Sequence, residues 1–181
     1  MASSSSADPD DHDKKSPGFF MKSTIASLQL KFPSVKNIST AQLWSWLQRP
    51  KERSVFLVDA RPEEEYNISH LENSHRVDYE DADMRAIVKK MEESFKDQNN
   101  PTVVCYCSLG YRSSVVAKNL QQFYETSGKT PVPEIYNLSG SIFQWANEER
   151  PMVDNNGKRT HFAHPYTPFW GKLLDEKHRK K

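Results

Sequence analysis

The most informative stretch of the chain reads Thr102-Val-Val-Cys-Tyr-Cys107-Ser-Leu-Gly-Tyr-Arg112-Ser-Ser. Its first five residues predict a strand that is buried on both faces, and the stretch that begins at Cys107 opens a predicted helix whose apolar face includes Val116, Leu120 and Phe123. Cys107 therefore stands where a strand gives way to a helix, so that backbone N–H groups and the helix dipole converge on it. Such a field lowers the pKa of a thiol and favours the nucleophilic thiolate.

The loop after Cys107 carries the other features of an anion site. We expect Arg112 to bind the anionic end of a substrate, because its guanidinium is a permanent planar cation. Gly110 allows the loop to curl, Ser113 is placed to cap the following helix, and Tyr111 is expected to contact a substrate or a partner. Successive amides of this loop can cradle an anion. The predicted substrate-binding residues are Ser108, Leu109, Gly110, Tyr111, Arg112 and Ser113.

The middle of the chain alternates between strand and helix patterns. Strands are predicted at residues 35–38, 54–59, 74–77, 102–106 and 134–138. The alternation predicts an α/β fold of three layers, in which helices cover both faces of a central, mostly parallel five-stranded sheet. Ligands bind such sheets beyond the carboxyl ends of the strands, which is where Cys107 and Asp59 lie.

Composition limits the partners and the compartment. The 181 residues include 25 Lys and Arg and 24 Asp and Glu, a net charge of +1 that does not predict a nucleic-acid partner. The two cysteines, Cys105 and Cys107, are too close for an unstrained disulfide and are typical of a reducing compartment. No apolar signal core or membrane-spanning stretch is present in the sequence. We expect a cytoplasmic protein without a membrane partner; nuclear and mitochondrial addresses and the oligomeric state stay open.

Changes in composition divide the chain into four parts. They are a disordered tail (1–18), an N-terminal extension (19–32), the main domain (33–153) and a C-terminal aromatic and basic extension (154–181). Met21, Ile25 and Leu28 share one helical face, which predicts a short helix packed outside the main domain. The aromatic run at residues 164–171 is expected to fold back onto the domain or to bind a partner.

Three segments, in order, resemble the signatures of rhodanese-type sulfurtransferase domains. They are Val58-Asp-Ala-Arg-Pro-Glu-Glu-Glu-Tyr66 with Ser69-His70-Leu71, then Cys107-Ser-Leu-Gly-Tyr-Arg112-Ser113, and finally Tyr136-Asn-Leu-Ser-Gly-Ser-Ile-Phe-Gln-Trp145 with Pro151. The resemblance covers about residues 33–153 and implies the one-domain α/β module of that family. Ser69 and Ser141 depart from it, because the family has glycine at both positions.

The resemblance also implies an activity. Sulfane sulfur would pass from thiosulfate or a persulfide, through a persulfide on Cys107, to a thiol acceptor or cyanide. Asp59 and Arg61 would support the site in a network with Glu65, and His70 would fix a turn. The implied partners are a small anionic sulfur donor and a thiol acceptor, either a small molecule or a protein. The reaction requires no metal and no organic cofactor.

Two other classes of function stay open. One is a non-catalytic rhodanese-like interaction module that binds through its aromatic C-terminal segment. The other is a cysteine phosphatase or arsenate reductase. Four residues separate Cys107 from Arg112, where phosphatases of this kind have five, and the shorter loop favours sulfur over phosphate. His161 and His164 lack a second pair of ligands at zinc spacing, so no metal site is expected.

Overall fold

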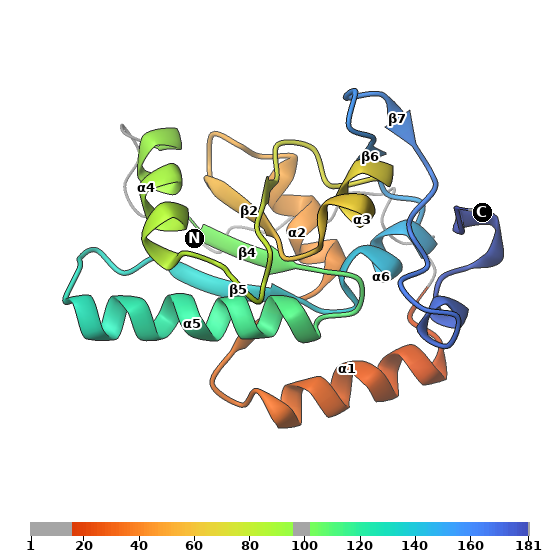
Figure 1. The fold of residues 1–181 in the computed structure, drawn as a ribbon, viewed down its shortest axis with the longest axis horizontal. Coiled ribbons are helices and arrows are strands. Elements are labelled where there is room, and N and C mark those ends of the chain that lie inside the picture. Colours follow the sequence, from red (N-terminus) through yellow and green to blue (C-terminus); the bar gives the residue numbers. More distant parts are fainter. Residues whose placement is uncertain (1–15, 96–101, 181) are drawn as a thin grey trace, which may run out of the picture.

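The computed structural model describes residues 16–95 and 102–180, so most of the predicted tail lies outside the described residues. Its elements (Figure 1) are α1 (Phe19–Lys31), β1 (Lys36–Ile38), α2 (Thr40–Leu47), β2 (Val55–Asp59), α3 (Glu63–Ile68), β3 (His75–Arg76), α4 (Met84–Ser94), β4 (Thr102–Tyr106), α5 (Tyr111–Ser127), β5 (Glu134–Leu138), α6 (Ser141–Asn147), β6 (Met152–Val153), β7 (Arg159–Thr160), and the 3-10 helices η2 (Trp170–Leu173) and η3 (Glu176–His178). Along these two ranges, no helix combines the length and apolar character needed to cross a bilayer.

A five-stranded parallel sheet in the order β1-β5-β4-β2-β3 forms the centre of the fold. This confirms the predicted α/β architecture. The apolar run of β4 is buried along its whole length, as expected for a central parallel strand. Because the strands are parallel, the carboxyl ends of β2, β4 and β5 lie at the same edge of the sheet. Asp59 and Cys107 are thus brought to one edge by the topology.

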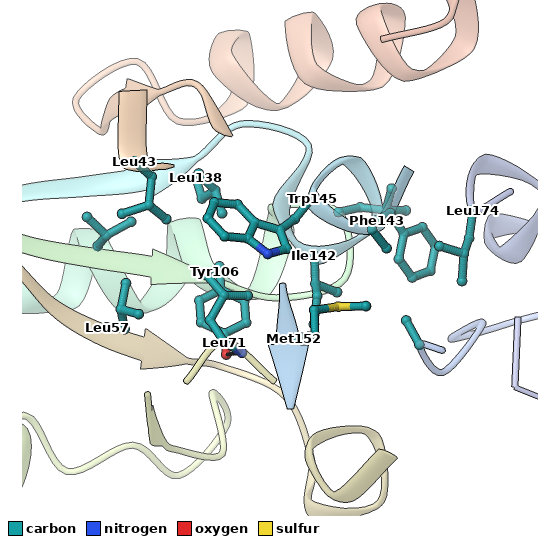
Figure 2. Close-up of a cluster of buried hydrophobic side chains, with 14 of the residues drawn as sticks. Leu43, Leu57, Leu71, Tyr106, Leu138, Ile142, Phe143, Trp145, Met152 and Leu174 are labelled. Atoms are coloured by element: carbon teal, nitrogen blue, oxygen red, sulfur yellow. Dashed lines mark hydrogen bonds between the residues drawn. The ribbon is translucent and has the colours of Figure 1, made fainter. Parts of the chain in front are cut away.

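Each face of the sheet has its own hydrophobic core. On one face, Leu57 and Val104 pack with side chains of α2 and α6, among them Leu43 and Trp145 (Figure 2). On the other face, strand residues such as Val103 pack with α4 and α5. Successive strand residues point to opposite faces, so the continuous apolar runs supply both cores.

The two ends of the described chain pack onto the first of these cores. Met21 of α1 is buried in it, and Ile25 packs against it. Ala163 and Leu174 of the C-terminal segment are fully buried there as well, so this segment folds back onto the domain. Figure 1 shows the C-terminal segment returning to the N-terminal end of α1. α1 and the C-terminal segment therefore lie on the side of the sheet where the cysteine loop (residues 107–110), between β4 and α5, is found.

Replacing Leu43 by Ala should lower the free energy of unfolding by about 2–5 kcal/mol, because the change leaves a cavity in a packed core. Leu43 is 0% exposed, whereas Leu30, also in a helix, is 83% exposed. The matched Leu30→Ala variant should change stability by less than about 0.5 kcal/mol. Urea unfolding of both variants measures the difference, and equal effects would contradict this account of the core.

Candidate active site

Cys107 follows β4 directly and begins the loop that leads into α5. Its side chain is only 2% exposed. Gly110 is the residue that precedes the helix, and its backbone φ of 123° is one that residues with a side chain rarely adopt. A Cβ atom at Gly110 would also lie 3.2 Å from Cδ1 of Leu28 and 3.4 Å from Nδ2 of Asn137. The tight loop therefore requires glycine at this position, both because of the backbone conformation and because neighbouring side chains leave little room for a Cβ atom.

The surroundings of the Cys107 sulfur favour a thiolate. Burial by itself would raise the pKa of this thiol. The positive charge of Arg112 and hydrogen bonds from the backbone amides of Ser113 and Gly110 act in the opposite direction and hold the pKa below its usual value. The Gly110 amide lies 3.1 Å from Sγ. These contacts favour the thiolate form of Cys107, and its role as a nucleophile stays a prediction.

Cys105 is a different kind of residue, although it lies only two positions earlier. It sits inside β4 and is fully buried in the core on the face of α4 and α5. Burial, and then the neighbouring charge of Cys107, raise the pKa of its thiol far above the usual range. Cys105 is therefore a small packed side chain, as expected from the sequence, and neither cysteine forms a disulfide.

Arg112 is held by Glu65 of α3. Its Nη1 and Nη2 donate to the two carboxylate oxygens of Glu65 at 2.8 and 2.9 Å, and Nη2 also donates to Oγ of Ser108 at 2.9 Å. The Ser108 hydroxyl donates to the same carboxylate at 2.7 Å. Burial would raise the pKa of Glu65, but Arg112 and Ser108 keep it below its usual value. The guanidinium thus has a partner within the protein, which the sequence did not predict.

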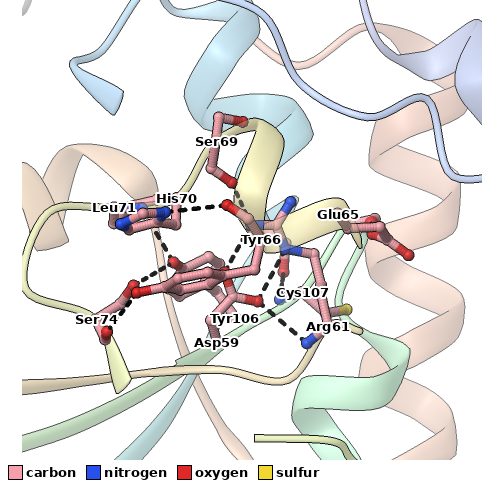
Figure 3. A network of polar contacts seen from close by, with 12 residues as sticks. Asp59, Arg61, Glu65, Tyr66, Ser69, His70, Leu71, Ser74, Tyr106 and Cys107 are labelled. Carbon is pink, nitrogen blue, oxygen red and sulfur yellow. Dashed lines mark hydrogen bonds and ion pairs between the residues drawn. The ribbon is translucent and has the colours of Figure 1, made fainter. Parts of the chain in front are cut away.

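A second buried ion pair lies beside the first (Figure 3). Arg61 donates from Nε and Nη2 to the two oxygens of Asp59, at 2.8 and 2.6 Å, and Nη2 also donates to the carbonyl of Ser69 at 2.6 Å. Both ion-paired side chains are fully buried. The supporting position expected for Asp59 and Arg61 agrees with this geometry. Glu65, in contrast, makes its hydrogen bonds to Arg112 and Ser108 rather than to Arg61.

Tyr106 is a supporting residue that the sequence analysis missed. Its hydroxyl accepts a hydrogen bond from the Leu71 amide at 3.0 Å and donates one to Ser74 Oγ at 2.9 Å (Figure 3). The loop after α3 is thereby tied to the residue that precedes Cys107. The only signal in the sequence is a tyrosine at the end of an otherwise apolar strand. His70 fixes the same loop, as expected, because its ring donates to the Tyr66 carbonyl at 3.0 Å.

The start of α6 holds the backbone of the cysteine loop. The Cys107 amide donates to Ser141 Oγ at 3.2 Å, and this hydroxyl donates to the Leu138 carbonyl at 3.1 Å. The Ile142 amide donates to the Cys107 carbonyl at 3.1 Å. Ser141 adopts a φ of 50°, which explains glycine at this position in the family, and its hydroxyl supplies contacts that glycine lacks. Ser69 has a φ of −166°, an extended conformation that any residue adopts.

Ser113 does not cap α5. Gly110 occupies the cap position without a side-chain hydrogen bond, so this prediction was wrong. The Ser113 hydroxyl instead donates to Asn137 Oδ1 at 2.7 Å, and Asn137 Nδ2 donates to Asn37 Oδ1 at 2.9 Å. Asn137 is a second residue that the sequence analysis missed. This chain of contacts ties the cysteine loop to β5 and β1.

A pocket of about 200 Å3 opens above Cys107. It is lined by Thr24, Leu28, Cys107, Ser108, Leu109, Tyr111, Arg112, Tyr166 and Trp170. Four of these residues come from α1 and from the C-terminal segment. A larger hollow of about 520 Å3 lies between α5 and β5, but no cysteine lines it. Within residues 16–95 and 102–180, no group of three or more His, Cys, Asp or Glu side chains is placed to hold a metal ion.

Replacing Arg112 by Met should raise the pKa of Cys107, because the change removes a positive charge beside the thiolate. The rate of alkylation by iodoacetamide, followed at Cys107 by peptide mass, should then rise at a higher pH than in the wild-type protein. Arg53→Met provides the control, since Arg53 pairs with Glu134 near the start of β5. An Arg112→Met profile that coincides with that of the control would contradict this view of the site.

Comparison with known structures supports the same fold. The chain is similar to an As-Sb reductase from Leishmania major, with 17% identity and a TM-score of 0.57, over 70% of this chain and 92% of that chain. It is also similar to Ygr203w, a yeast protein tyrosine phosphatase of the rhodanese family, with 20% identity and a TM-score of 0.52, over 61% of this chain and 83% of that chain. At such identities the likeness concerns the fold alone.

The sequence comparison identifies the family. No match was found among curated protein sequences. Residues 39–148 match the family model of the rhodanese-like domain, and this segment contains α2 to α6, both buried ion pairs and the whole cysteine loop. Since the match spans more than half of the chain, this protein belongs to the rhodanese-like domain family.

Proposed function

We propose that the protein is a sulfurtransferase that carries sulfane sulfur on Cys107. The observation that supports this most directly is the state of the Cys107 thiol. Its pKa is lowered by Arg112, Ser113 and Gly110 against the effect of burial, and its side chain lines a pocket. A persulfide carrier needs a thiolate for attack and nearby donors for the negative charge of the persulfide that results.

In the proposed reaction, the Cys107 thiolate attacks the outer sulfur of a donor such as a persulfide, R–S–SH. A bond forms between Sγ and that sulfur, while the S–S bond of the donor breaks. Its electron pair leaves with the inner sulfur, which takes the proton and departs as R–SH. The product is the Cys107 persulfide anion, and attack by an acceptor thiolate on its outer sulfur returns Cys107 to the thiolate. No external oxidant or reductant is needed.

The pocket lining favours sulfur transfer over phosphate-ester hydrolysis. Among the described residues that line the pocket, none is Asp, Glu or His. A phosphatase benefits from such a group, because the alcohol that leaves must be protonated. The thiol that leaves a persulfide takes its proton from the donor itself and needs no acid from the protein. The nearest carboxylate, that of Glu65, is already bonded to Arg112 and Ser108.

The compartment and partners follow from the same chemistry. Both cysteines are free thiols, which suits a reducing compartment such as the cytoplasm. The proposed partners are a small sulfur donor and a thiol acceptor. A non-catalytic interaction module would not require the thiolate-stabilising contacts around Cys107, so these contacts support a catalytic function.

Incubation of the reduced protein with thiosulfate or inorganic polysulfide should add one sulfur, ~32 Da, to Cys107. The intact mass before and after treatment with cyanide measures this gain, because cyanide removes sulfane sulfur. Cys107→Ser should abolish the gain, whereas Cys105→Ser should retain it, since Cys105 is buried in the core.

The same protein should neither hydrolyse an aryl phosphate nor reduce arsenate. Turnover of either compound without a cyanide-labile mass gain would overturn the proposal in favour of the phosphatase or reductase alternative. Two results together would instead support the interaction module. Cys107 would gain no sulfur from any donor, and a binding partner would still bind the Cys107→Ser variant.

A further inference from the structure

The pocket over Cys107 is made by three separate parts of the chain. The cysteine loop forms its floor, α1 contributes Thr24 and Leu28, and the C-terminal segment contributes Tyr166 and Trp170. α1 lies close to the loop, because Leu28 would be the nearest neighbour of a Cβ atom on Gly110. The ring of Tyr111, which also lines the pocket, is in edge contact with that of Phe32, with centroids 5.6 Å apart. The side chains that α1 and the C-terminal segment contribute to the pocket are therefore mostly apolar or aromatic.

The positive charge in this pocket is compensated by the protein itself. Arg112 is the one ionised side chain among the nine described residues that line it, apart from the Cys107 thiolate itself. The carboxylate of Glu65 forms a bidentate ion pair with its guanidinium. The Cζ atom of Arg112 lies 4.5 Å from the ring centroid of Tyr166. Lys31 lies over the ring of Tyr111 but is not among the lining residues. No cation without a partner within the protein thus faces the sulfur from the described lining.

A dianion such as thiosulfate would enter this pocket at a cost. It would lose its hydration shell and meet a thiolate of the same sign, while the nearest guanidinium is already paired. A donor with an apolar body loses little on leaving water and gains contact with Leu28, Tyr166 and Trp170. The pocket volume of about 200 Å3 suits a small organic group.

We propose that the protein selects sulfane-sulfur donors in which the sulfur is attached to an uncharged, apolar organic group, in preference to thiosulfate. This inference rests on the proposed sulfurtransferase function and names its substrate class as small organic persulfides. Leu28, Tyr166 and Trp170 determine specificity through contact with the organic group. Glu65 determines it through charge, because it compensates Arg112.

The test compares three donors, namely thiosulfate, methanethiosulfonate and benzenethiosulfonate. The rate of Cys107 persulfide formation is measured by rapid quenching and intact mass, and each rate is divided by that of the same donor with free cysteine. The thiosulfonates carry one negative charge and an apolar organic group, and attack of the Cys107 thiolate on their outer sulfur breaks the S–S bond and releases a sulfinate. Thiosulfate carries two negative charges and no organic group, and the same attack releases sulfite. We expect the normalised rate to be highest with benzenethiosulfonate, lower with methanethiosulfonate and lowest with thiosulfate. The highest and lowest rates should differ by at least about tenfold.

Two variants separate the contribution of contact from that of charge. Leu28→Ala should lower the rate with benzenethiosulfonate about tenfold relative to the rate with thiosulfate, since only the former has an organic group that contacts the pocket wall. Leu30→Ala, on the same helix but 83% exposed, should change neither rate. Glu65→Gln, which leaves Arg112 uncompensated, should raise the rate with thiosulfate relative to the thiosulfonates. If the Glu65→Gln variant does not fold, the Leu28→Ala variant still tests the selectivity by itself.

The outcomes distinguish this inference from the proposed function. Normalised rates that are equal for all three donors, or an equal loss for all donors in Leu28→Ala, would overturn the selectivity while the sulfurtransferase function stands. A Cys107 that accepts sulfur from none of these donors and from no inorganic polysulfide would overturn the proposed function and the selectivity with it.

Discussion

The ion pair between Arg112 and Glu65 is the interaction on which the site depends. It joins the first turn of α5 to α3, and Ser108 bonds to both partners. The pair is almost completely buried, so that removal of one partner leaves the other charge uncompensated at a cost in stability. It fixes the loop in the conformation that places the Gly110 amide on the Cys107 sulfur, and it supplies the positive charge that favours the thiolate.

The loop is held from other directions as well. The Ser141 hydroxyl and the first amides of α6 bond to its backbone, Ser113 ties it to Asn137 of β5, and Tyr106 ties the preceding residue to the loop after α3. Such multiple attachment keeps a nucleophile in place without a rigid element of its own. It also explains how a chain that departs from its family at Ser141 retains the loop, because the serine hydroxyl bonds to the residues that the turn must join.

Features that depend on residues close together in the sequence were predicted, whereas contacts between residues far apart in the sequence were not. The strands, the cysteine loop and the buried state of Cys105 were predicted, because each rests on a local pattern of apolar residues. The partner of Arg112 was not predicted, since Glu65 lies 47 positions away. Ser113 was assigned to a helix cap from its position alone, but the helix begins two residues earlier, at Tyr111, and Gly110 occupies the cap position.

The amino-acid sequence alone determined the family, the parallel sheet and the position of Cys107 at the end of a central strand, because these follow from short patterns and from their order along the chain. Only the tertiary structure decided what surrounds Cys107. Residues from α1 and from the C-terminal segment meet over Cys107 although more than a hundred positions separate them, for example Leu28 and Trp170. Both ends of the described chain carry apolar residues that must be buried, and the first core is where Met21 and Leu174 find that burial.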